Sequence, residues 1–191
     1  MLDNFPGKKG EIKMPLYLKR ILSKIGEIRI YADDTNVVGL LMANEVHKGS
    51  DQELCFVKSG QNEILIQAAE ELKSFFSGNL QEFSVPVRVS GTNFQKAVWK
   101  TLRTVEYGQL QTYADVARAI GNPMAVRAVG RAIGSNPVPI IIPCHRVIGS
   151  DASLTGFGGG LATKQVLLEM EGHTIINLKI RNNNRLSRQY Q

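Results

Sequence analysis

The segment from Pro137 to Gly149 constrains this chain more than any other, because its backbone has little freedom. It reads Pro-Val-Pro-Ile-Ile-Ile-Pro-Cys-His-Arg-Val-Ile-Gly, with three prolines and three consecutive isoleucines around a single cysteine. Proline fixes its own φ and biases the residue before it away from helix. We therefore expect an extended, buried segment that holds Cys144 on a stiff backbone.

Cys144 is followed at once by His145 and Arg146, a pattern that suits an activated thiol. Apolar burial raises the pKa of a thiol, so a reactive cysteine needs a base or a positive charge nearby, which these two residues could supply. Neighbouring side chains point in different directions in regular structure, so a turn or a bridging water would have to connect His145 to the thiol. An isolated Cys-His pair is more often a structural cysteine beside a surface histidine. The rest of the chain favours the nucleophile.

Composition limits the possible classes of protein. A chain of 191 residues fits one large domain or two small ones. Its two cysteines, Cys55 and Cys144, lie far apart, so neither a disulfide framework nor a zinc site is indicated, and we expect no metal. There is no long apolar span, and the polar start does not resemble a signal peptide. These features predict a cytoplasmic protein, or a nuclear one if the source has a nucleus, without a membrane partner.

The net charge of +6 is unevenly distributed along the chain. Residues 1–90 carry 11 Lys and Arg against 12 Asp and Glu, whereas residues 91–191 carry 12 against 5. A basic half joined to a nearly neutral half indicates a polyanionic partner for the second half, although a merely soluble basic surface would look the same.

The first half is expected to be a scaffold of strands and one helix. Residues 25–31 and 37–42 are predicted strands, joined by the turn-rich hairpin connection 32–36. The helix is predicted over 63–77, where apolar residues repeat along one face before Gly78. The other expected elements are a loose leader over 1–15, a third strand over 54–57 containing Cys55, and a short extended piece over 85–89.

The second half is expected to be mostly helical and to contain a helix-turn-helix. Thr92 or Asn93 can cap a helix from residue 94 to about 104. Two further short helices, 112–120 and 124–133, flank a tight turn with glycine and proline. Because small residues line the second of these helices and Arg127 and Arg131 share its face, a nucleic-acid contact is favoured over an ordinary helical hairpin.

Three segments follow the cysteine. Residues 151–160 contain four glycines around Phe157, which predicts a mobile loop with an aromatic platform. Residues 162–171 predict a helix whose last turn would bring Glu171 within reach of the histidine. The basic, asparagine-rich segment 176–191 predicts a mobile tail attracted to phosphates.

Taken in order, several of these residues match a known family. Tyr113, the Arg127-Ala128-Val129-Gly130 run, Asn136-Pro137-Val138-Pro139, Pro143-Cys144-His145-Arg146-Val147 and Glu171-Gly172 together resemble the O6-alkylguanine-DNA alkyltransferases. The match covers residues 94–172 with the spacing of the family, and the first 90 residues match only in general plan. It implies an α/β (α+β) fold with an N-terminal scaffold domain of a small antiparallel sheet with a helix, 1–90, and a DNA-binding and alkyl-acceptor domain, 91–175. The basic tail, 176–191, is not covered by the resemblance and is expected from its composition.

The resemblance implies direct DNA repair by a monomer without cofactors. Cys144 would take the alkyl group from O6-alkylguanine in double-stranded DNA and keep it as a thioether, so each molecule would act once. His145 would draw the thiol proton through a water, with Glu171 supporting the imidazole and Asn136 holding the turn. The helix-turn-helix would enter the minor groove, and Arg127 would fill the place of the flipped nucleotide. The implied DNA-binding residues are Gln95, Tyr113, Ala114, Asn122, Ala125, Arg127 and Ala128, and the implied pocket residues are Tyr113, Ile133, Val147, Phe157 and Gly158.

The sequence departs from some members of that family in the glycine-rich loop. Phe157 stands where a tyrosine is frequent, and Gly158 stands where a serine may contact O6. Stacking on the base is kept, but a side-chain donor is lost, which suggests a roomier pocket. The preference among alkyl groups and activity on O4-alkylthymine are left open. Two other functions also remain: a cysteine hydrolase or peroxidase, which would turn over many times, and a DNA-binding regulator without chemistry.

Overall fold

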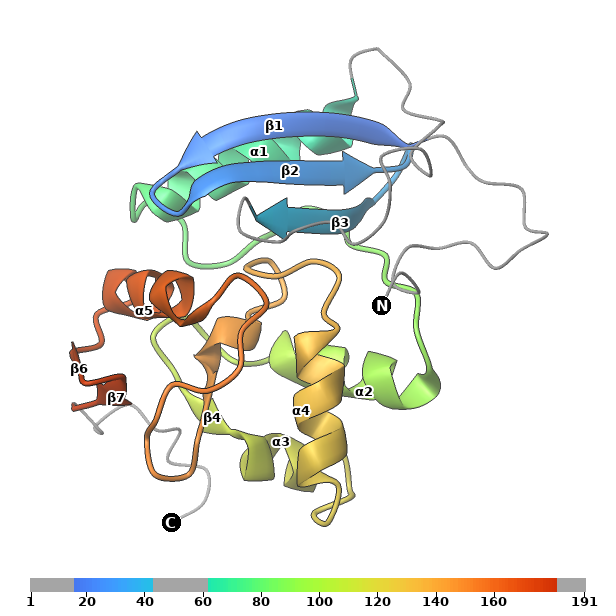
Figure 1. Ribbon diagram of the computed structural model, residues 1–191. Coiled ribbons are helices and arrows are strands. Elements are labelled where there is room, and N and C mark those ends of the chain that lie inside the picture. The colour runs from blue at the N-terminus through green and yellow to red at the C-terminus, as the bar shows by residue number, and fades with distance from the viewer. Residues whose placement is uncertain (1–15, 43–61, 182–191) are drawn as a thin grey trace. The chain divides into compact units, whose positions relative to one another are not determined.

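The chain divides into two compact units, one ending at Gly91 and the other beginning at Thr92. The computed structural model describes residues 16–42 and 62–181 (Figure 1). The expected leader, the expected strand around Cys55 and the part of the tail after residue 181 lie outside these residues. The observed division lies next to the boundary expected after residue 90, and the assignment of three domains remains a proposal.

A three-stranded antiparallel sheet forms the centre of the first unit. Its strands β1 (Tyr17–Ser23), β2 (Gly26–Ala32) and β3 (Val37–Met42) are ordered as they occur in the chain. The hairpin from β2 to β3 confirms the prediction, and its turn is held by Asp33, whose carboxylate accepts the N–H groups of Thr35 and Asn36 at 2.8 Å each. Strand β1 was not predicted.

Helix α1 (Glu63–Phe76) lies along one face of this sheet, as predicted (Figure 1). Asn62 caps its start by accepting the N–H of Leu65 at 2.8 Å. The expected extended piece after the helix pairs with the sheet, because Val87 forms a bridge with Val37. The helix buries its apolar face with Leu65, Ala68, Ala69, Leu72, Phe75 and Phe76.

Four helices build most of the second unit: α2 (Asn93–Leu102), α3 (Tyr113–Ala119), α4 (Val126–Gly134) and α5 (Leu161–Met170). Capping boxes start two of them, with Thr92 and Gln95 at α2 and with Thr112 and Asp115 at α3. The helices α3 and α4 form the predicted helix-turn-helix, with Gly121 at a φ of 73° in the connection.

A short parallel pair, β4 (Gln111–Thr112) and β5 (Val147–Ile148), was not predicted from the sequence. It joins the strand directly before α3 to the strand directly after the 3₁₀ helix η2 (Cys144–Arg146). This pairing therefore brings the first turn of α3 next to the cysteine segment.

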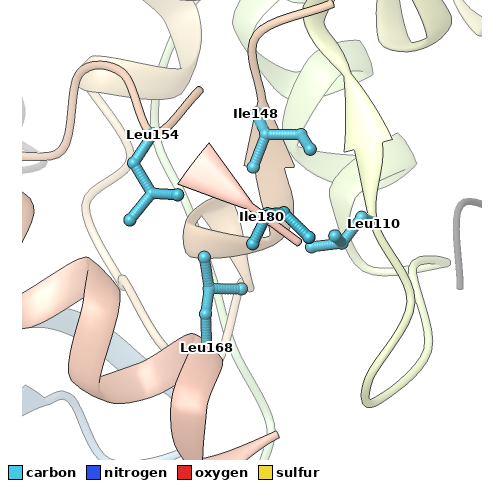
Figure 2. Packing of buried hydrophobic residues seen from close by; sticks show 5 residues of the cluster. All are labelled: Leu110, Ile148, Leu154, Leu168 and Ile180. Atoms are coloured by element: carbon cyan, nitrogen blue, oxygen red, sulfur yellow. The ribbon is translucent and has the colours of Figure 1, made fainter. Parts of the chain in front are cut away.

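The prediction of a mobile tail from residue 176 is wrong for its first residues. Strands β6 (Ile175–Ile176) and β7 (Lys179–Ile180) form a hairpin. Ile180 is 4% exposed and belongs to a buried cluster shown in Figure 2, whose other members are Leu110, Ile148, Leu154 and Leu168. The polar and basic residues that follow the hairpin in the sequence concealed this packing.

The fold is thus the expected mixture of α/β (α+β) type. A small sheet with its helix comes first, and a mostly helical unit with a helix-turn-helix comes second. Among the described residues, no helix has the length and apolar character needed to span a membrane.

Candidate active site

The segment that leads to the cysteine is buried, as predicted, but it is a tight turn and not an extended chain. The N–H of Ile142 donates to the carbonyl of Val138 at 2.9 Å, and Ile140 has a φ of 76°. Each proline restricts its own φ and the residue before it, but Ile140 and Ile141 are free of both constraints. The chain therefore turns between Pro139 and Ile142.

Asn136 connects this turn to the thiol. Its side-chain N–H₂ donates to the carbonyl of Ile142 at 2.9 Å and to Sγ of Cys144 at 3.1 Å, while its Oδ1 accepts the N–H of Val138 at 3.1 Å. Cys144 begins η2 and is 4% exposed. A hydrogen bond donated to sulfur favours the thiolate over the thiol, so the Asn136 amide both fixes the turn and supports an ionised nucleophile.

His145 and Glu171 form a buried pair. The imidazole Nε2 lies 2.9 Å from Oε1 of Glu171, and both side chains are fully buried. The other ring nitrogen, Nδ1, has no hydrogen-bond partner among the described residues. If Nε2 carries the proton that faces the carboxylate, Nδ1 is left as a buried acceptor.

Arg146 holds the same carboxylate more extensively than His145 does. Its Nε and Nη2 donate to Glu171 at 2.9 to 3.0 Å, its Nη1 donates to the carbonyl of Val105 at 2.6 Å, and its guanidinium lies 5.8 Å from the centre of the Tyr107 ring. Gly108 adds a backbone N–H to Oε2 at 3.1 Å. Arg146 therefore neutralises Glu171, which differs from the expectation that it would supply charge to the thiol.

The electrostatics of this cluster favour a neutral imidazole beside an ionised carboxylate. Burial by itself would raise the pKa of Glu171, but His145 and Arg146 outweigh it and lower this pKa to about 2. Burial lowers the pKa of His145 below its usual 6.5, although Glu171 opposes the shift. At neutral pH, His145 is therefore a neutral group that can accept a proton.

Lys164 is a further buried charge near the thiol, and it was not predicted. Its Nζ donates to the carbonyls of Val147 at 2.5 Å and Thr155 at 2.8 Å. Burial lowers its pKa to about 8, and the nearby Cys144 partly opposes that shift. Its burial could have been inferred from its spacing to Leu167, Leu168 and Glu171. Residues three, four and seven positions apart share one face of a helix.

Tyr113 lies beside the glycine-rich loop. Its hydroxyl donates to the carbonyl of Thr155 at 3.2 Å, and burial followed by the neighbouring Cys144 raises its pKa. Gly130 on α4 faces the tyrosine ring, where an added Cβ would lie 3.8 Å from two ring carbons. The structure thus brings Tyr113, Cys144 and the loop together.

The expected DNA-contact residues divide into two groups. Asn122, Arg127 and Ala128 are exposed, while Ala114 and Ala125 are half-buried. Gln95 instead uses its side chain within the protein, where it accepts the N–H of Thr92 and donates to the hydroxyl of Ser135. Of the expected pocket residues, Ile133 and Val147 are buried, Phe157 is half-buried and Gly158 is exposed.

No group of three or more His, Cys, Asp or Glu residues suited to a metal ion occurs in the described parts of the chain. The groups that the site brings together are a thiol, an imidazole–carboxylate pair and a buried ammonium group.

Acid should destabilise the fold through the Glu171 cluster. The unfolded chain binds protons below about pH 4.5, whereas folded Glu171 does so only near its pKa of about 2. The stability from this carboxylate is complete above about pH 4.5 and is lost as the pH falls toward 2, and His145 adds a loss in the same direction below its usual 6.5. The free energy of unfolding in urea, measured at several pH values, should fall with this profile. Glu171→Gln should remove part of the slope, and an unchanged slope in that variant would contradict the assignment.

Comparison with known proteins agrees with this geometry. Residues 93–173 match the family model described as the 6-O-methylguanine DNA methyltransferase DNA binding domain. The methylated-DNA–protein-cysteine methyltransferase of Haemophilus influenzae is 40% identical over 157 residues, which are 82% of this chain and 86% of that protein. The protein of the same name from Mycolicibacterium paratuberculosis is 40% identical over 152 residues, covering 78% of this chain and 88% of its own.

Solved structures show the same fold. The Mycobacterium tuberculosis O6-methylguanine methyltransferase superposes with a TM-score of 0.74 at 38% identity and covers 82% of this chain and 92% of its own. The structure of Mycobacterium tuberculosis OGT in complex with DNA gives the same TM-score and identity, with 82% and 93% covered. The chain belongs to the methylated-DNA–protein-cysteine methyltransferase family.

Proposed function

We propose that this protein repairs double-stranded DNA by moving the alkyl group of O6-alkylguanine onto the sulfur of Cys144, once per molecule. The observation that carries the proposal is the position of Cys144 next to His145: the thiol accepts a hydrogen bond from Asn136, and the histidine is paired with Glu171. Membership of the family and the structure of a DNA-bound relative support DNA as the partner.

The thiol proton leaves through His145. Because Nε2 faces Glu171, the acceptor is Nδ1, and a water carries the proton from sulfur to that nitrogen. The imidazolium that forms is stabilised by the carboxylate at 2.9 Å. The resulting thiolate is buried in surroundings of low polarity. Asn136 donates a hydrogen bond to it, and the positive charge of Lys164 lies nearby.

The thiolate attacks the alkyl carbon. A carbon–sulfur bond forms while the bond from that carbon to O6 breaks, and the electron pair of the broken bond passes to the guanine. The base takes up one proton and becomes ordinary guanine. The thioether product has no easy hydrolytic exit, so the protein is consumed in the reaction.

The burial of Cys144 requires that the damaged nucleotide leave the helix. A thiol that is 4% exposed cannot reach O6 of a stacked base, and enzymes that act on bases in duplex DNA flip them out at a cost of a few kcal/mol. In the proposed mode, α4 lies in the minor groove with Ala128 exposed toward the DNA and Arg127 in the gap. Tyr113 lies next to the flipped base, and Phe157 stacks on it.

The proposal also covers the oligomeric state of the protein, its binding to DNA and its place in the cell. We propose that it acts as a monomer. The excess of Lys and Arg after residue 90 supports salt-dependent binding to any duplex. We propose that it acts in the cytoplasm, or in the nucleus of a source that has one.

Counting repaired bases tests the single use of Cys144. A duplex with O6-methylguanine, mixed in excess with the protein, should yield one repaired guanine per protein molecule and then stop. A hydrolase would continue to consume the substrate, and a DNA-binding regulator would repair none. Either outcome would overturn the proposed function.

Arg127→Ala should separate base flipping from chemistry. Arg127 and Arg131 are both exposed on α4, and within the described residues neither side chain makes a hydrogen bond or ion pair. Loss of the Arg127 side chain should slow repair of duplex DNA by roughly one to two orders of magnitude, at ~1.4 kcal/mol for each factor of ten. Transfer from free O6-benzylguanine, which needs no flipping, should be almost unchanged.

Arg131→Ala is the matched control, since it removes the same side chain one turn along the helix. It should weaken binding to damaged and undamaged duplex modestly and equally. If Arg127→Ala slows both the duplex and the free-base reactions together, Arg127 is a structural residue of α4 and does not fill the gap.

A further inference from the structure

The β6–β7 hairpin pairs with the beginning of the glycine-rich loop. The N–H of Leu154 donates to the carbonyl of Leu178 at 2.7 Å, and the N–H of Ile180 donates to the carbonyl of Ala152 at 3.0 Å. Ser153 forms an antiparallel bridge with Lys179 between these two bonds. Residues 152–154 therefore act as a third strand of the hairpin, and the loop leaves this strand toward the thiol.

Buried side chains of the hairpin and of the start of the loop also pack together. Figure 2 shows Leu154 and Ile180 gathered with Leu110, Ile148 and Leu168. Ile148 ends β5, the strand that directly follows the cysteine helix η2. The cluster thus contacts the hairpin, the start of the loop and the strand next to the reactive residue.

Both sides of the pairing contain strained backbone. Ala152 has a φ of 64° and Leu178 a φ of 57°, and neither is a glycine. Such conformations are costly for residues with a Cβ and persist only where the surroundings impose them. The side chain of Leu178 is 42% exposed, so its own packing does not account for the strain. Leu178 and Asn177, with a φ of 50°, are instead the two turn residues between β6 and β7, and a two-residue hairpin turn of this kind requires positive φ at both positions. The turn leaves the carbonyl of Leu178 free to accept the N–H of Leu154.

One residue, Thr155, connects this pairing to the active site. Thr155 follows Leu154, and its carbonyl accepts from the hydroxyl of Tyr113 at 3.2 Å and from Nζ of Lys164 at 2.8 Å. Its own hydroxyl donates to that of Tyr113 at 3.3 Å. The loop is consequently held by the hairpin at Leu154 and by the site at Thr155, two adjacent residues.

We propose that the β6–β7 hairpin positions the glycine-rich loop and Tyr113 for alkyl transfer, with Ile180 as its key positioning residue. This inference rests on the proposed function, because the loop is taken to hold the alkylated base. The hairpin does not touch the base. It acts by fixing where the loop starts, and therefore where Thr155 and Phe157 lie relative to Cys144.

The test compares two reactions of the same thiol in the full-length protein. Transfer from free O6-benzylguanine needs an ordered loop, whereas alkylation of Cys144 by iodoacetamide needs only an accessible, ionised thiol. In Ile180→Ala the ratio of the first rate to the second should fall about tenfold, since small misplacements of reacting groups cost up to about 10²-fold. Leu178→Gly, which keeps the turn without strain, should leave the ratio as it is.

Ile176→Ala is the matched control, because it removes the same side chain from the same hairpin at a position that is 50% exposed. Its ratio should equal that of the wild type. Ile180→Val loses a single methylene, so it stays folded if Ile180→Ala does not, and it should show a smaller fall in the ratio.

Rates should be measured well below the melting temperature of each variant, so that loss of folded protein does not enter the ratio. A ratio that stays within about twofold of wild type in Ile180→Ala, or in Ile180→Val where the alanine variant is unfolded, overturns the positioning role. Absence of methyl uptake by the wild type from a duplex containing O6-methylguanine, with normal iodoacetamide alkylation, would instead overturn the proposed function.

Discussion

Replacing Cys144 with serine should abolish alkyl uptake while leaving duplex binding nearly intact. Serine keeps the size of the side chain, so the turn through Asn136 and Ile142 can persist, but its hydroxyl is a much weaker nucleophile than a thiolate. His145 cannot compensate, because an imidazole is far too weak a base to ionise an alcohol substantially. Transfer should be followed by the loss of O6-methylguanine from a labelled duplex, and binding by a gel-shift titration with the same DNA.

The other cysteine provides the control for this assignment. Cys55→Ser should transfer the alkyl group at the rate of the wild type. If Cys144→Ser still takes up one methyl group and the group is found on Cys55, the acceptor has been assigned to the wrong residue.

Glu171→Gln should be among the most destabilising conservative changes in the chain. The carboxylate accepts hydrogen bonds from Arg146, His145 and the backbone of Gly108, all of them buried. Glutamine removes the charge and faces the guanidinium with an N–H₂ group, which leaves Arg146 as an uncompensated buried cation. Breaking a buried ion pair in this way costs about 3–5 kcal/mol of unfolding free energy. Transfer by the folded variant should also slow, because the imidazolium loses its counter-charge.

Glu169→Gln is the matched control for this change. Glu169 lies two residues earlier, at the exposed end of α5, and accepts a hydrogen bond from Gln165. Its substitution should change stability by no more than about 0.5 kcal/mol. Equal effects of the two changes in urea unfolding would mean that the Glu171 cluster does not hold the fold together.

Arg146 also affects the coupling between His145 and Glu171. Because Arg146 also depends on the carboxylate, a double substitution of His145 and Glu171 alters stability as well as proton transfer. The two residues should still be non-additive in their effect on the transfer rate. The comparison is informative only when the folded fraction of each variant is measured alongside.

Local signals in the sequence predicted most of the fold. The predicted cap Thr92 and the glycine of the turn, Gly121, perform the roles that their residue types favour, whereas the capping box of Thr112 was not predicted. The hairpin after β2 followed from its turn residues. The stretch around Cys144 and the position of Glu171 could also be anticipated, because resemblance to a family carries the arrangement of a site that local patterns do not encode.

Other features depend on contacts between distant residues and could not be predicted from local patterns. The parallel pairing of Gln111 with Val147 spans two helices, and nothing in either short strand signals its partner. Arg146 was expected to act on the thiol because it is close in sequence, whereas its geometry directs it to Glu171. The turn at Ile140 was missed because two prolines suggested extended chain on both sides of it.

The hairpin of β6 and β7 was missed for a different reason. Four of its six residues, 175–180, are apolar, but the polar and basic residues that follow dominated the prediction for 176–191. Its turn also has Asn177 and Leu178 at positive φ, where a glycine would have been the recognisable signal. The burial of Ile180 against Leu154 and Leu168, and the backbone pairing with residues 152–154, show that the segment belongs to the unit.

The most direct test of the central claim is the mass of the protein after reaction with a duplex containing O6-methylguanine. The account predicts that the intact protein gains the mass of one methyl group, that the gain never exceeds one per molecule, and that fragmentation places it on Cys144. The DNA should contain guanine in place of the lesion. A protein whose mass is unchanged while the lesion disappears would be a hydrolase, and one whose mass and DNA are both unchanged would be a binder. Either result, or a methyl group on any other residue, would contradict the account.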